Sequence, residues 1–436
     1  MKSANFAFCE QVVLALLLIL GTYLPTSTDG EHSRFWVFTS FAALMGLLGY
    51  LSWNFGVLPS AVPQITLPIL IVLVGCTLIA MVKDHYEFDF GMLVKFSALA
   101  AVLSLDLRKL RLGHFGYRAF VVVNCINLAL GAGILIGSEW ATDFVTKYYW
   151  SFTPGLVQWM SSLHKPVLSF GSHSVAALFL YLFFWANWKD YELHRRRPSS
   201  LLALGHLVLL LGLTSFASLG LGALALVQVC IWLWRKQRRQ IIIVGSCLVG
   251  LLILALRIAA DETNQIADLP QFAPAVFLNN DVSGPLARYG RDGELRMAIN
   301  YVYNHPLSPI GLTAGPSAPM EVVWTPFHFF IGDSGPLEYL LRGSVPLFFL
   351  IYFGLYGFLR RNLVLRSHAW SLFLAILLFE SGFSVLSYSR MYYLLPFFVV
   401  YLNGVASGSA VQSAQGTIPA RFGPKRLAHL GSPNSA

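Results

Sequence analysis

Long apolar runs recur along almost the whole of this chain, and they limit its fold more than any other feature. Each run is about 17–20 residues long, enough for one α-helix to cross roughly 30 Å of hydrocarbon. The runs lack the alternation of polar and apolar residues that marks a membrane β-barrel. Hydrophobic residues make up 56% of the chain and charged residues only 12%, far from the balance of a soluble domain. We therefore predict an all-α polytopic membrane protein.

We expect about twelve membrane-spanning helices in a single bundle over residues 1–403, followed by a flexible cytoplasmic tail at 404–436. The first span carries Glu10, but no clear cleavage site follows it, so we expect a retained span and not a removed signal peptide. The expected spans are 6–25, 35–52, 63–82, 88–104, 118–136, 173–188, 199–215, 217–234, 240–257, 336–359, 368–385 and 386–403.

Lysine and arginine residues predict the orientation of this bundle. If the N-terminus is cytoplasmic, the cytoplasmic side carries nineteen of the thirty basic residues and the outer side ten, while Lys95 falls inside a span. Positive residues accumulate on the cytoplasmic side of membrane proteins. We therefore expect both termini in the cytoplasm. Topology then explains the net charge of +9, and no nucleic-acid partner is implied.

Two long connections, 137–172 and 258–335, are the most promising places for a function. Both are expected on the outer face, and long connections in a compact bundle are usually functional or disordered. The first is rich in aromatic residues, which suit anchoring at the membrane surface or stacking against sugar rings. In the second, Leu295, Ile299 and Val302 recur at helical spacing. We expect a short amphipathic helix there.

Arg288, Arg291 and Arg296 form the charge cluster that most favours a binding site. They lie within nine residues of one another, on the face that should be poor in positive charge. A guanidinium group presents a fork of donors that matches phosphate oxygens, so arginines at a membrane surface suit a lipid diphosphate. A solvated helix face is the alternative explanation, and the residues alone leave both open.

Several ionisable residues lie inside or at the rim of the expected spans, where a charge needs a partner or a water-filled cavity. Glu338 and Arg342 are four residues apart, in the order that favours a helical ion pair. Asp333 or Ser334 can cap the helix that follows, because Pro336 suits its first turn. The other members of this group are Glu10, Lys95, Arg257 and Glu380. The five cysteines fit neither a disulfide framework nor a metal site.

Four segments between residues 153 and 404 occur in an order that points to a known family. They are "LHKPVLSFGSHSVAALFLYLFF", "LLGLTSFASLGLGALAL", "YGRDGELRMAINYVYNHPLSPIGL" and "GDSGPLEYLLRGSVPLFFLIYFGLYGFL". In this order they resemble the Wzy family of bacterial polysaccharide polymerases, which shares a superfamily with the O-antigen ligases. The Asp-Ser pair of the last segment resembles the polymerases more than the ligases, where His-Asn is commoner. The chain departs from the family at the turn 214–220, which lacks an arginine, at Pro309 and at Lys165.

The resemblance implies a GT-C-like bundle that joins oligosaccharide repeat units at the outer face of the bacterial inner membrane. One undecaprenyl-diphosphate-linked chain would be the donor, and a hydroxyl of a second lipid-linked unit would be the acceptor. Arg288 and Arg291, with Lys165 as a third cation, would stabilise the leaving diphosphate, without a metal ion or a cofactor. Arg296 would bind the acceptor diphosphate or have no role. Expected partners are these lipid-linked glycans, the bilayer, and a chain-length regulator or export complex.

The resemblance also implies two candidate bases. Asp333 would orient or deprotonate the acceptor hydroxyl, and His305 is the competing base. Ser172 and His173 would line the path of the sugar, or would simply begin a helix.

Three other functions remain open at this stage. An O-antigen ligase uses the same donor with lipid A–core as the acceptor. A flippase for lipid-linked oligosaccharides usually shows two related halves, and no repeat relates 1–200 to 201–436. A non-catalytic partner of an export complex would tolerate substitution of Arg288, Arg291 and Asp333.

Overall fold

The structure is a computed structural model that describes residues 4–28, 31–57, 62–149, 163–236, 309–313, 335–380, 384–386 and 388–416. Its α-helices are α1 (Ala4–Tyr23), α2 (Arg34–Phe55), α3 (Val62–Lys83), α4 (Phe90–Ser104), α5 (His114–Leu135), α6 (Glu139–Tyr148), α8 (His173–His194), α9 (Arg197–Gly212), α10 (Phe216–Lys236), α14 (Gly335–Asn362), α15 (Arg366–Glu380) and α16 (Ser389–Gly416). Two 3₁₀ turns, η1 (Leu107–Lys109) and η2 (Leu168–Phe170), join them. A small antiparallel ribbon pairs β1 (Ser27–Thr28) with β2 (Glu31–His32).

Helices occupy eleven of the twelve ranges expected from the sequence, and the remaining range, 240–257, lies outside the described residues. Six of the described helices are long and apolar enough to cross a membrane, namely α2, α3, α5, α10, α14 and α16. Shorter apolar helical segments occur in α1, α4 and α9. The prediction of a helical membrane protein with several spans is therefore confirmed, while α16 continues past its expected end to Gly416.

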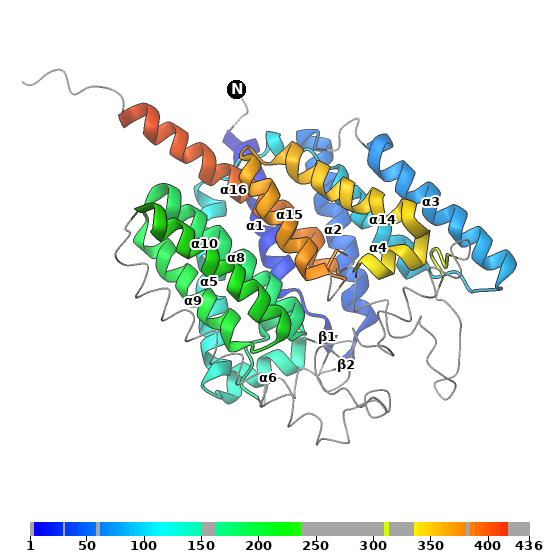
Figure 1. The fold of residues 1–436 in the computed structure, drawn as a ribbon, viewed down its shortest axis with the longest axis horizontal. Helices are drawn as coiled ribbons and strands as arrows, with labels where there is room; N and C mark the ends of the chain where they lie inside the picture. The colour runs from blue at the N-terminus through cyan, green and yellow to red at the C-terminus, as the bar shows by residue number, and fades with distance from the viewer. Residues whose placement is uncertain are drawn as a thin grey trace, which may run out of the picture.

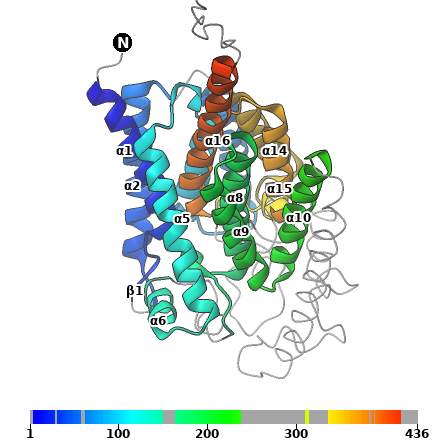
Figure 2. The same ribbon diagram turned by 90° about the vertical axis from the view of Figure 1, so that its left-hand side faces the viewer.

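The described helices run between two distinct ends of one bundle (Figures 1 and 2). One end holds the start of α1 and the end of α16, and we call it the terminal end. The opposite end holds β1, β2 and α6, and we call it the hairpin end.

Two helices, α8 and α16, form the centre of the bundle and pack against each other. Every residue from Val175 to Trp188 in α8 and from Met391 to Leu402 in α16 is buried. A helix that is apolar on all sides lies either in the core of a protein or in contact with lipid, and here other helices surround both. The peripheral helices α2 and α3, in contrast, expose large apolar side chains such as Phe38, Trp53 and Ile71, which suit contact with lipid.

The connection between α4 and α5 joins several helices at the terminal end. Asn362, the last residue of α14, accepts a hydrogen bond from the N–H of Leu107 (2.6 Å) and donates one to the carbonyl of Leu105 (2.9 Å). Glu10 of α1 accepts a hydrogen bond from the N–H of Arg111 (2.6 Å). These contacts satisfy backbone groups that lie outside regular helices. They also place the last residue of α14 at the terminal end.

Candidate functional site

The residues predicted for the site lie partly in the described chain. Lys165 precedes α8 and is buried, with 5% of its surface exposed. His173 is the first residue of α8, as expected for the start of a span, and is half-buried. The other predicted site residues lie outside the described residues: Arg288, Arg291, Arg296, His305 and Asp333.

The segment that carries Lys165 is fixed to neighbouring helices at the hairpin end. The hydroxyl of Ser169 donates a hydrogen bond to the carbonyl of Thr22 at the end of α1 (2.5 Å). The hydroxyl of Tyr388, just before α16, donates to the carbonyl of Phe170 (3.0 Å). The segment therefore lies between the end of α1 and the start of α16.

Arg390, near the start of α16, is buried against the same end of α1. Its Nη1 donates to the carbonyls of Gly21 (3.2 Å) and Thr22 (2.5 Å), and its Nη2 donates to the carbonyl of Leu24 (3.0 Å). The last carbonyls of a helix have no partner within the helix, so this guanidinium acts as a cap for α1. It also lies over the ring of Tyr149, 5.4 Å from the centroid. Burial raises the pKa of the Tyr149 phenol.

A buried charged cluster lies where α14 meets α4 at the hairpin end. The Nε of Arg342 lies 3.4 Å from Oε1 of Glu338, and the Nζ of Lys95 in α4 lies 3.5 Å from the same oxygen. The other oxygen of Glu338 accepts a hydrogen bond from the hydroxyl of Ser384. The helical ion pair between Glu338 and Arg342 is therefore confirmed. Lys95 is its third member, contributed by a different helix.

Arg342 also holds the strip 309–313, a short part of the second long connection. Its Nη1 donates to the carbonyl of Gly311 (2.8 Å). The next residue, Leu312, donates its N–H to the hydroxyl of Thr77 in α3 (2.8 Å). The strip is therefore held between α14 and α3.

The helix α14 is broken directly after Arg342. Gly343 has φ −146° and ψ 20°, and Ser344 has φ 54° and ψ −160°, so neither residue is helical. A break inside a membrane helix leaves carbonyls that neighbouring groups must satisfy. Here the carbonyls of Leu341 and Arg342 each accept an N–H hydrogen bond from the strip 309–313, at 2.9 Å. The break in α14 and the strip therefore stabilise each other.

Glu380, the last residue of α15, is buried beside this cluster. Its Oε2 accepts hydrogen bonds from the hydroxyls of Tyr339 (3.1 Å) and Tyr352 (3.2 Å), and its Oε1 accepts one from the N–H of Leu386 (2.6 Å). The carboxylate also lies against Gly335, the first residue of α14, where a Cβ atom would overlap it. Glu380 therefore connects the start of α14 to the end of α15.

These contacts show what the hairpin end can do chemically. Its buried charges contact one another or the backbone, as charges at membrane depth usually do. Among the described residues, such an arrangement holds chain segments in fixed positions. Among the residues that the structure describes, no group of three His, Cys, Asp or Glu side chains is placed to hold a metal ion.

The sequence identified these charges but not their arrangement. Lys95, Glu338, Arg342 and Glu380 were all recognised as residues that need partners at membrane depth. Only the pair four residues apart on one helix could be assigned, because helical spacing is a local property. The contacts of Lys95 and Glu380 cross between helices, so the sequence held no signal for them.

Comparison with known proteins adds no relative, since no protein-family model and no curated protein matches this chain.

Proposed function

We propose that this protein is a membrane glycosyltransferase, a polymerase of the Wzy type. It joins undecaprenyl-diphosphate-linked oligosaccharide repeat units at the outer face of the bacterial inner membrane. In this proposal the bundle has twelve spans and both termini are cytoplasmic, so the hairpin end faces outward.

The contact between Arg342 and the strip 309–313 is the observation that carries the proposal. The strip begins four residues after His305 in the sequence, and α14 begins two residues after Asp333. Arg342 and Leu341 tie the strip to α14, so the two segments that follow the proposed bases in the sequence are in contact with each other. An active site that combines Asp333 with the arginines before His305 requires this closeness.

In the proposed reaction, the acceptor hydroxyl oxygen attacks the anomeric carbon of the donor sugar. A glycosidic C–O bond forms, the bond from the anomeric carbon to the diphosphate oxygen breaks, and undecaprenyl diphosphate leaves with the electron pair. Asp333 accepts the proton of the hydroxyl. Arg288, Arg291 and Lys165 stabilise the negative charge that develops on the diphosphate, so the reaction needs neither a nucleotide nor a metal ion.

The direct test is to incubate the purified full-length protein with lipid-linked repeat units, without added metal, and to measure the sizes of the products. A ladder of multiples of the repeat unit is the expected result. Transfer of the glycan only to added lipid A–core would identify a ligase instead. Movement of the lipid-linked unit across a vesicle membrane without any new product would identify a flippase.

Substitutions then test the assigned roles. We expect Arg288→Ala and Arg291→Ala each to slow elongation by about 10²–10³-fold, the usual effect of removing a group that stabilises charge. Asp333→Asn should slow it by about 10²–10⁴-fold. Arg366→Ala removes an exposed arginine at the start of α15 and is the matched control, which should elongate normally.

Two outcomes would contradict the assignment. If His305→Gln abolishes elongation while Asp333→Asn does not, His305 is the base. If the protein inserts normally and tolerates loss of all three residues, it is a non-catalytic partner.

A further inference from the structure

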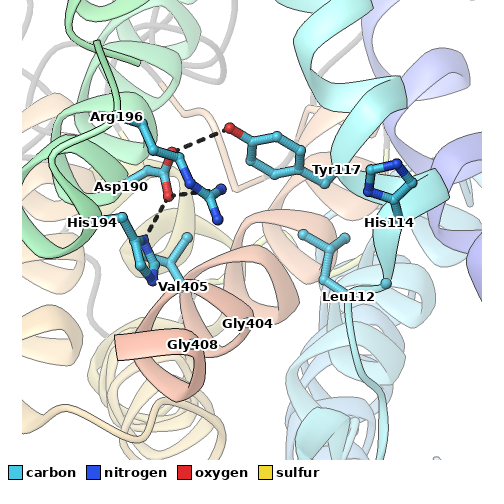
Figure 3. Close-up of a pocket in the computed structure, with 10 residues that line it drawn as sticks. Leu112, His114, Tyr117, Asp190, His194, Arg196, Gly404, Val405 and Gly408 are labelled. Atoms are coloured by element: carbon cyan, nitrogen blue, oxygen red, sulfur yellow. Dashed lines mark hydrogen bonds and ion pairs between the residues drawn. The ribbon is translucent and has the colours of Figure 1, made fainter. Parts of the chain in front are cut away.

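A pocket of about 440 Å³ opens at the terminal end of the bundle, between α5, α8 and α16 (Figure 3). It lies at the end opposite to the charged cluster of Glu338 and Arg342, and the proposed polymerase reaction makes no use of it. Its inner wall carries Asp190, a fully buried carboxylate near the end of α8.

The hydrogen-bonding capacity of Asp190 is taken up by neighbouring groups. Its Oδ1 lies 2.8 Å from Nδ1 of His194 and 3.5 Å from Nη1 of Arg196. Its Oδ2 accepts hydrogen bonds from the hydroxyls of Tyr117 (3.3 Å) and Ser199. Figure 3 shows the contacts of Asp190 with His194, Arg196 and Tyr117. The partners of Asp190 therefore offset its negative charge, so it should repel a bound anion only weakly.

The rest of the pocket lining carries one arginine and two histidines beside Tyr117, glycines and apolar residues. Arg196 lies over the ring of Tyr117, 5.0 Å from the centroid, and its side chain is 44% exposed. A guanidinium has five N–H donors, so one ion pair with Asp190 leaves donors for a ligand. His114, which is exposed, lines the pocket at the first residue of α5, where the helix dipole also favours an anion. Asp190 is the only acidic residue among the described residues that line the pocket.

The space in the pocket depends on glycines. Gly404 and Gly408 lie on α16 at one wall of the pocket, to which Val405 also contributes its side chain (Figure 3). A Cβ atom at Gly408 would come within 2.9 Å of Nε2 of His194. The imidazole of His194 therefore lies close to the backbone of α16 at Gly408, where a larger residue would displace it.

The position of the pocket favours a lipid as the source of the anion. His114 begins α5, which is long and apolar enough to span a membrane, so the pocket lies at the level where a span meets water. Phe8 and Phe115 are both exposed and contact each other, with ring centroids 5.9 Å apart. Phe115 follows His114 in α5 and Phe8 lies on α1, and the exposed apolar surface of the two rings suits an acyl chain. The arginines at 195–197 agree with a cytoplasmic location, where anionic lipids are concentrated.

We propose that this pocket binds the phosphate of an anionic phospholipid headgroup in the cytoplasmic leaflet, with Arg196 as its main ligand. The guanidinium donates to the phosphate oxygens, and His114 and the start of α5 complete the site. The acyl chains lie against the exposed apolar surface of α5.

Native mass spectrometry of the full-length protein in detergent tests this site. The protein is titrated with an equal mixture of phosphatidylglycerol and phosphatidylcholine, and the bound lipids are counted. We expect preferential binding of phosphatidylglycerol, and a roughly five- to tenfold loss of its affinity in Arg196→Gln. Arg196→Lys keeps the charge but loses the planar fork of donors. Its affinity for phosphatidylglycerol should lie between those of the native protein and Arg196→Gln. Arg197→Gln, the exposed neighbour outside the pocket, is the matched control and should bind as the native protein does.

Size-exclusion chromatography and the melting temperature of each variant show whether it is folded. Equal affinity for phosphatidylglycerol in folded Arg196→Gln and in the native protein would overturn the proposal. Inorganic phosphate is titrated in a separate arm. If phosphate alone raises the melting temperature as much as phosphatidylglycerol does, the ligand is a soluble phosphate, and the lipid assignment is wrong.

Discussion

Gly335 and Glu380 are in direct contact at the hairpin end, where the first residue of α14 lies against the carboxylate at the end of α15. A Cβ atom at position 335 would overlap Oε2 of Glu380. That carboxylate cannot easily move aside, because Tyr339, Tyr352 and the N–H of Leu386 all donate hydrogen bonds to it. The start of α14 therefore requires glycine for reasons of packing.

We expect Gly335→Ala to destabilise the protein by about 1–3 kcal/mol, the usual effect of adding atoms to a packed interior. The measurement is thermal unfolding of the purified protein in detergent. Gly357→Ala is the matched control, since Gly357 lies in the same helix with open space around its Cα. Alanine is the better helix former, so this control should melt at the native temperature or slightly above it. Equal melting temperatures for the two variants would contradict the packing argument.

Arg342 should be one of the most costly residues to remove from this protein. Arg342→Met takes the guanidinium from Glu338 and from the carbonyls of Gly311 and Thr313. Loss of one member of a buried ion pair typically costs about 3–5 kcal/mol, because the partner charge stays buried. Thermal unfolding of the variant measures this loss, and Arg366→Met, at an exposed position, should change stability little.

The double variant separates the ion pair from the backbone contacts. If the ion pair between Glu338 and Arg342 stabilises the protein, the double variant Glu338→Leu/Arg342→Met should lose less stability than the two single variants lose together. Additive losses would show that Arg342 acts through the strip 309–313 alone.

Asn362 should be important for the stability of the terminal end. Its fully buried side chain accepts from the N–H of Leu107, so Asn362→Ala removes this partner of a buried backbone group. The carbonyl of Leu105 also loses its bond from Asn362 but keeps the one from Arg361 (3.1 Å). Unsatisfied buried groups cost about 1–3 kcal/mol. Asn54→Ala, which removes a single exposed bond to the carbonyl of Tyr50, should change the melting temperature far less. Similar effects of the two substitutions would refute a special role for Asn362.

The orientation of the bundle can be tested with single cysteines. In a variant whose five native cysteines are replaced by serine, Glu139→Cys places a thiol at an exposed position in α6, at the hairpin end. Arg197→Cys places one at the exposed first residue of α9. A maleimide that cannot cross membranes should label position 139 in intact spheroplasts, and position 197 only after permeabilisation, because basic residues are retained in the cytoplasm. The reverse pattern would place the hairpin end in the cytoplasm.

The ends of α8 and α9 show how closely local sequence predicts local structure. The span expected from residue 173 begins at His173. The expected spans 199–215 and 217–234 are separate helices, with the break between Gly212 and Phe216. At that turn, Ser215 and Ser218 exchange hydrogen bonds that cap α10. Each of these features depends on residues only a few positions apart, so the sequence predicts them directly.

Arg390 shows where such local reasoning ends. Arg390 is one of the ten basic residues expected on the outer side, and the sequence held no signal for its partners. The structure shows a buried cap whose carbonyl partners, at Gly21, Thr22 and Leu24, come from the other end of the chain. No spacing rule joins residues more than 360 positions apart.

The amino-acid sequence by itself determined which segments become helices and that the protein belongs in a membrane. Both properties follow from the length and apolar character of single segments, since each backbone N–H finds its partner four residues away. Only the tertiary structure decided that Lys95 reaches Glu338, that Glu380 meets Gly335, and that Arg342 holds the strip 309–313. Those contacts depend on which helices pack against each other. Because the apolar faces of the helices are similar, the sequence does not show which pairs form.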